Sequence, residues 1–100
     1  MRRKIDYLLL PLICLISLNA MAQGNLNMMK MESEMLRLIS SPDKDAFMQV
    51  TETLKAECQK QGNERLFYSA WGNQSTYEAT HQNYMRAEEI ADQIAAYAES

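Results

Sequence analysis

The fold is decided by residues 63–98, NERLFYSAWGNQSTYEATHQNYMRAEEIADQIAAYA. Apolar residues recur at three- and four-residue spacings on both sides of the polar pair Gln82-Asn83, which predicts two amphipathic helices joined by a turn. The first stripe comprises Leu66, Phe67, Ala70, Trp71 and Tyr77, and the second comprises Ala87, Ile90, Ala91, Ile94, Ala95 and Ala98. Two such helices bury their stripes against each other, so the stretch predicts an antiparallel hairpin over residues 63–98. The alanines allow close approach, and we expect Trp71 and Tyr84 to fill the remaining gap.

A second hairpin is predicted over residues 26–61. Its first helix is rich in methionine, with one ridge formed by Met28, Met31, Met35 and Leu38. Ser41 is the expected N-cap of the next helix, with Pro42 at the first helical position. That helix should run from Asp43 to Gln61 and place Phe47, Val50, Leu54 and Cys58 in line.

Small and polar residues mark the junction between the two hairpins. Gly62 is the expected residue just after the helix end, and Asn63 can cap the third helix directly. No strand pattern occurs in the sequence. The prediction is therefore an all-α domain over residues 23–100, with four helices in two antiparallel hairpins and short turns between them.

Residues 1–22 are typical of a secretory signal peptide. A basic segment, residues 1–6, precedes the apolar run of residues 7–18, and Ala20-Met21-Ala22 is a small-residue cleavage motif. A membrane-spanning helix needs roughly 20 apolar residues, so this run is too short for a permanent anchor. We expect cleavage between Ala22 and Gln23, release to the periplasm or the medium, and membrane contact only before cleavage.

Charge and cysteine content limit the classes of partner. The whole chain has a formal net charge of −3, and removal of residues 1–22 leaves seven basic and twelve acidic side chains, so the charge becomes −5. The basic residues are scattered, which argues against nucleic acid, because phosphate binding requires clustered Lys and Arg. Cys58 would be the only cysteine after cleavage, so no internal disulfide can form.

The second hairpin resembles a tetratricopeptide (TPR) repeat. The matching residues are Trp71, Ser75, Tyr84, Ala87 and Ala91, whereas Gln74, Glu78 and Ile94 depart from the usual pattern of the repeat. The chain as a whole looks like the periplasmic N-terminal region of TPR-containing bacterial sensor histidine kinases and related regulators. This resemblance implies an α-solenoid arrangement and a role in protein interaction or signal transduction. The two hairpins are offset by about 41 residues, longer than the usual TPR period of about 34.

Catalytic and metal-binding groups are sparse. One cysteine and one histidine, Cys58 and His81, are the minimum for a thiol mechanism, and they provide only half of a typical zinc site. We therefore predict no enzymatic activity, no catalytic residues and no cofactor. An alternative is a small exported copper-binding protein that uses the thioethers of residues 28–35, since soft sulfur ligands suit Cu(I). A methionine ridge at helical spacing is more typical of core packing.

The leading interpretation is an exported protein-interaction or ligand-sensing module that presents a groove. In helical-repeat arrays the first helix of each hairpin lines the concave surface. The binding candidates are therefore Tyr68, Asn73, Gln74, Tyr77 and His81. Because two hairpins are fewer than a stable array usually has, we expect either self-association or that the chain is the N-terminal part of a longer protein.

Overall fold

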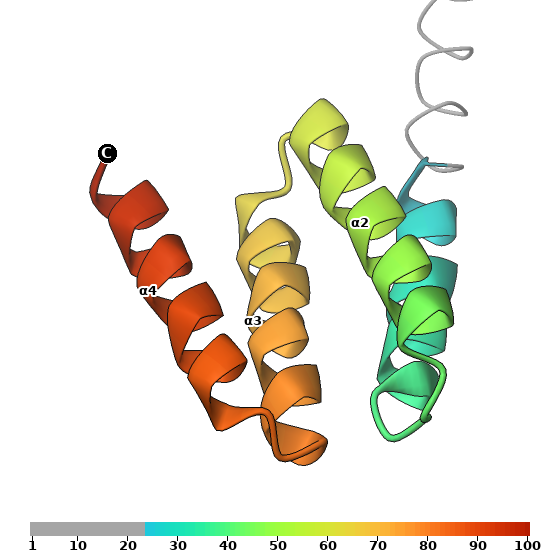
Figure 1. Ribbon diagram of the computed structural model, residues 1–100. Helices are drawn as coiled ribbons and strands as arrows, with labels where there is room; N and C mark the ends of the chain where they lie inside the picture. The colour runs from blue at the N-terminus through green and yellow to red at the C-terminus, as the bar shows by residue number, and fades with distance from the viewer. Residues whose placement is uncertain (1–23) are drawn as a thin grey trace, which may run out of the picture.

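The protein is described here by a computed structural model, which covers residues 24–100; the predicted signal peptide lies outside this range. The described chain is entirely helical and consists of a first helix at residues 24–38, α2 (Lys44–Gln61), α3 (Glu64–Thr80) and α4 (Tyr84–Glu99). Figure 1 shows the four helices side by side, with α4 at one end and the first helix at the other, each antiparallel to the next. The predicted all-α fold of two hairpins is confirmed. Within residues 24–100, no helix is both long and apolar enough to cross a bilayer.

The turn between the first helix and α2 is capped by Asp43. The Asp43 carboxylate accepts a hydrogen bond from the Ala46 amide at 3.1 Å, and the Ser41 hydroxyl oxygen accepts from the Asp43 amide at 3.1 Å. The prediction of Ser41 as N-cap is therefore wrong by two residues. Both side chains are good caps, and the one closer to the first free amides of α2 takes the cap position.

The junction between α2 and α3 follows the prediction. Gly62 ends α2 in the left-handed conformation with φ 71°, and its Cβ position is open. The Asn63 side chain then accepts from the Leu66 amide at 3.2 Å. In the α3–α4 turn the left-handed residue is Gln82, with φ 66°. Asn83 makes no side-chain cap bond there and donates from Nδ2 to Glu78 at 2.8 Å instead.

The core lies where the first helix, α2 and α3 meet. The largest fully buried side chains are Met35, Phe47, Thr51, Leu54 and Cys58, four of them from α2. The Met28, Met31 and Met35 ridge faces this core, as the spacing predicts. The helix α2 lies between the first helix and α3, so its fully buried side chains form the centre of the core.

Among the helices of residues 24–100, the last helix, α4, packs mainly against α3. Ala87 and Ile90 are buried against α3 and Ile94 is half-buried, whereas Ala91, Ala95 and Ala98 are exposed. The predicted stripe is wider than the surface that one neighbouring helix can cover.

The expectation that Tyr84 fills the gap between α3 and α4 is wrong. It is 65% exposed at the start of α4. Tyr97 contributes aromatic bulk at the other end of α4, where its ring centroid lies 5.5 Å from that of Trp71.

Candidate functional site

The predicted binding residues lie along α3 but do not surround one groove. Tyr77 is buried: its ring stacks on Phe47 at a centroid distance of 4.4 Å, and its hydroxyl donates to the Ser41 carbonyl oxygen at 2.8 Å. These contacts join α3 to α2 and to the preceding turn. In this structure Tyr77 therefore holds the two hairpins together.

Two other candidates are engaged in contacts within the fold. The centroid of the His81 ring lies 4.1 Å from that of the Tyr77 ring, and His81 Nε2 is 3.3 Å from the Ile39 carbonyl oxygen. Asn73 donates from Nδ2 to the Ser69 carbonyl oxygen of its own helix at 2.9 Å. Neither residue lines a hollow described below.

Gln74 lies in a groove that both hairpins line. We call it the α3 groove: α2 and α4 form its sides and α3 its floor, and it encloses about 220 Å³. Its lining comprises Lys44, Met48, Glu52, Lys55, Trp71, Gln74, Glu78, Arg86, Ile90 and Gln93. Of these residues, Gln74 was predicted from the sequence as a binding residue and Trp71 as a packing residue of the repeat. The residues from α2 and α4 were not predicted, because the periodicity does not fix how these helices are placed relative to α3.

A polar network fixes the floor of the α3 groove. Gln74 Nε2 donates to the Glu52 carboxylate at 2.8 Å, and Lys55 donates to Gln74 Oε1 at 3.3 Å. Lys55 also lies 3.5 Å from the Glu52 carboxylate and 4.8 Å from the centroid of the Trp71 ring. In this network α2 and α3 hold one another's polar groups in fixed positions.

At the other end of the groove, Glu78 forms a second polar link. The carboxylate is almost fully buried, and it accepts from Lys44 Nζ at 2.6 Å and from Asn83 Nδ2 at 2.8 Å. Within residues 24–100, no buried side-chain nitrogen or oxygen lacks a hydrogen-bond partner. The groove is thus lined by charged groups that are already paired and oriented.

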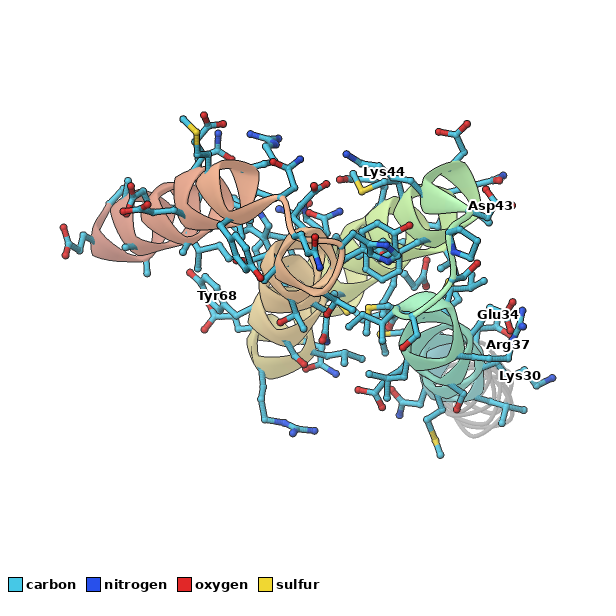
Figure 2. All side chains as sticks on the ribbon, turned by 60° about the horizontal axis from the view of Figure 1, so that its bottom comes forward. Lys30, Glu34, Arg37, Asp43, Lys44 and Tyr68 are labelled. Carbon is cyan, nitrogen blue, oxygen red and sulfur yellow. The ribbon has the colours of Figure 1, made fainter. Side chains whose placement is uncertain are left out.

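Tyr68 belongs to a different hollow, which we call the aromatic hollow. It is lined by Cys58, Gln59, Gly62, Asn63, Glu64, Phe67, Tyr68 and Tyr97 and encloses about 220 Å³. Figure 2 shows Tyr68 and Lys44 on different sides of α3, so the two hollows open on different faces. Tyr97 was not predicted as a site residue, although its position in the sequence beyond Ile94 placed it near the edge of the α4 stripe.

The methionine helix has one buried and one exposed side. On the buried side, Met28 Sδ lies 3.9 Å from Cys58 Sγ. Burial raises the pKa of the Cys58 thiol, and the negative charges of Glu32 and Glu57 raise it further. The thiol is therefore protonated and unreactive near neutral pH.

The outward side of the first helix carries an exposed apolar stripe, Leu26, Met29 and Leu36. Lys30, Glu34 and Arg37 lie beside it on the side that faces away from α3 (Figure 2). The Arg37 guanidinium pairs with Glu34, and its hydrogen bonds hold the pKa of that carboxyl below its usual range. On α4, at the other end of the series of helices, the surface has a shallow hollow. It is lined by Met85, Glu88, Glu89 and Asp92.

No group of three or more His, Cys, Asp or Glu side chains with metal-binding geometry occurs in the described part of the chain. Comparison with protein-family models, with curated proteins and with solved structures finds no match to this chain.

Proposed function

We propose that the chain is an exported binding module without chemistry of its own, which recognises a segment of another protein in the α3 groove. In this proposal it belongs to the N-terminal part of a TPR-type sensor or scaffold. The observation that carries the proposal is that one groove is lined by three helices from both hairpins. A ligand bound there would contact both hairpins at once, so its affinity would depend on how the two hairpins are placed relative to each other.

The size and lining of the groove favour a peptide side chain over a free metabolite. Its volume, about 220 Å³, is below the roughly 300–1,000 Å³ typical of small-molecule sites. Met48, Trp71 and Ile90 offer apolar contact. Gln93 offers a donor at the rim, and Arg86, which pairs with Glu89 at 3.0 Å through one guanidinium nitrogen, has further N–H donors. Aromatic and arginine residues of this kind dominate the energetics of many protein interfaces.

The contact between α3 and α4 supports the TPR-like part of the proposal. Ser75 Oγ donates to the Ala87 carbonyl oxygen at 2.7 Å, so the two helices approach closely at these small residues. Ser75 and Ala87 are two of the positions on which the resemblance rests. Tyr84, which also matches the repeat, is 65% exposed and makes no comparable contact within residues 24–100.

A peptide-display selection on the purified protein tests the binding function. We expect enriched peptides whose binding falls at least tenfold when Arg86→Ala or Trp71→Leu alters the groove. Met85→Ala, on the outward side of α4, is the matched control and should bind normally. The absence of enrichment, or enrichment that is unaffected by both groove variants, would refute the proposal.

Self-association is the second part of the proposal. The exposed apolar stripe of the first helix and the exposed alanines of α4, Ala91, Ala95 and Ala98, lie on the two end helices, and pairing one with the other would let copies stack end to end. Size-exclusion chromatography with light scattering should show oligomers that Met29→Lys disrupts. A monodisperse monomer at high protein concentration would contradict this part alone.

The contact between Cys58 and Met28 keeps copper binding as a second candidate function. The two sulfur atoms are 3.9 Å apart. If each lay about 2.3 Å from a shared metal ion, the length of a zinc–thiolate bond, the sulfur–metal–sulfur angle would be about 116°. In this candidate site Met31, which packs against the same core, is the third soft ligand, and the Cys58 thiol releases its proton to solvent when the metal binds.

Cu(I) competition with a chromophoric chelator tests the copper site. Binding should be lost in Met28→Leu and Cys58→Ser and retained in Met29→Leu, whose side chain is exposed. Equal affinity of wild type and Met28→Leu would exclude this candidate.

A further inference from the structure

The aromatic hollow is walled by three mutually inclined rings. The ring centroids of Phe67 and Tyr68 are 5.4 Å apart, those of Phe67 and Tyr97 5.8 Å, and those of Tyr68 and Tyr97 6.2 Å. The angles between their planes are 71°, 50° and 63°, so no two of them stack. Rings arranged in this way form a corner with aromatic surface on several sides.

Part of this aromatic surface faces solvent. Tyr97 is 48% exposed and Tyr68 is half-buried, although both are large apolar side chains in contact with the core residue Phe67. The electron-rich faces of such rings attract cations, most strongly cations that lose little hydration energy on binding. Glu64 adds a carboxylate to the rim of the hollow.

The same aromatic cluster already holds a cation elsewhere. Trp71 contacts both Phe67 and Tyr97, and the Lys55 ammonium lies 4.8 Å from the centroid of the Trp71 ring. The net charge of −5 for residues 23–100 also favours a positively charged ligand over a negative one.

Three hydrogen-bond acceptors at the hollow are engaged within the protein, and Glu64 adds a carboxylate at the rim. The carbonyl oxygens of Cys58 and Gln59 accept from the amides of Asn63 and Gly62, and the Asn63 side chain caps α3. A primary ammonium can pair with Glu64, but it is strongly hydrated and loses much of that hydration when it moves onto aromatic surface. A quaternary ammonium is more weakly hydrated because it has no N–H groups, so it loses less hydration on the same surface.

We propose that the aromatic hollow binds a small quaternary ammonium compound. The methyl groups contact Phe67, Tyr68 and Tyr97, and Glu64 balances the charge. This site is separate from the α3 groove, so its function does not depend on peptide binding.

Calorimetric titration of the purified protein with choline chloride, at constant ionic strength, tests this proposal. The neutral isostere 3,3-dimethylbutan-1-ol has the same shape without the charge. We expect saturable binding of choline and at least tenfold weaker binding of the alcohol. Equal binding of the two would overturn the proposal, because it would show that apolar contact alone is recognised.

Matched tyrosine variants locate the site. Tyr97→Leu should weaken choline binding at least tenfold and Glu64→Gln severalfold, whereas Tyr84→Leu, at the other end of α4, should bind like wild type. Circular dichroism confirms that each variant is folded. The absence of saturable binding to the wild-type protein, or normal binding by folded Tyr97→Leu, would overturn the proposal.

Discussion

Replacing Tyr77 with phenylalanine removes one hydroxyl group and leaves the ring that stacks on Phe47. The lost hydrogen bond, 2.8 Å to the carbonyl oxygen of half-buried Ser41, joins α3 to the turn before α2. A hydrogen bond of this kind contributes about 0.5–1.5 kcal/mol, and a carbonyl left without a partner favours the upper part of that range. We therefore expect Tyr77→Phe to lower the free energy of unfolding by about 1 kcal/mol.

Urea denaturation followed by Trp71 fluorescence and by circular dichroism measures this difference. With a slope of about 1–3 kcal/mol/M, the midpoint should fall by roughly 0.3–1 M. Tyr84→Phe is the control: Tyr84 is 65% exposed, and its hydroxyl makes no protein hydrogen bond in the described residues. Its stability should stay within about 0.5 kcal/mol of wild type.

The pH dependence gives a second test of the same contact. Burial raises the pKa of the Tyr77 hydroxyl, and the negative charge of Glu78 raises it further. The folded protein therefore keeps this proton to higher pH than the unfolded chain, whose tyrosines have a pKa of about 10. The contribution of Tyr77 is complete below that pH and is lost as the pH rises through the raised pKa.

The stability difference between wild type and Tyr77→Phe should accordingly narrow above about pH 10. Equal stabilities at pH 7, or a difference that does not narrow in alkaline solution, would refute the assigned role of Tyr77.

Three further predictions concern the backbone and the core. Gly62→Ala should lower the free energy of unfolding by about 1 kcal/mol, because Gly62 has φ 71°, which an alanine adopts only with strain. Gly72→Ala should raise it by about 0.5–1 kcal/mol, because Gly72 lies inside α3 with open space at its Cβ position. Equal effects of the two variants in chemical denaturation would contradict the reasoning. Leu54→Ala should lower the free energy of unfolding by about 2–5 kcal/mol, since Leu54 is fully buried in the core. A denaturation midpoint close to that of the wild type would show that Leu54 is not a core residue. Cys58 should react with Ellman's reagent at least a hundredfold more slowly in the native protein than in urea, because it is buried and its thiol pKa is raised. Fast labelling of the native protein would show that the first helix does not cover Cys58.

Local signals in the sequence determine much of this fold. The helix α2 ends at Gly62 because glycine readily adopts the left-handed conformation, and α3 begins after Asn63 because the Asn63 side-chain oxygen caps it. Each of these signals depends on a single residue, so the sequence alone reveals it. The cap of α2 was harder to predict, since Ser41 and Asp43 are both good caps within two residues. Which of them caps α2 depends on the path of the turn, and a pattern of residue types does not specify that path.

The binding candidates could not be placed by periodicity alone. The spacing shows that Gln74 and Tyr77 lie on α3, but it does not show that α2 covers the side of α3 that carries them. As a result Tyr77 serves in packing, and Gln74 is held by Glu52 and Lys55 in the floor of a groove. Tyr97 was missed because its role depends on the rings that α3 brings to it.

Chemical-shift mapping is the most direct test of the proposed α3 groove. An enriched peptide from the display selection is titrated into ¹⁵N-labelled protein, and the backbone amide shifts are followed. The proposal predicts that the largest changes cluster at Met48, Lys55, Trp71, Gln74 and Ile90, which line the groove on three helices. Changes confined to the outward side of the first helix or of α4 would contradict it.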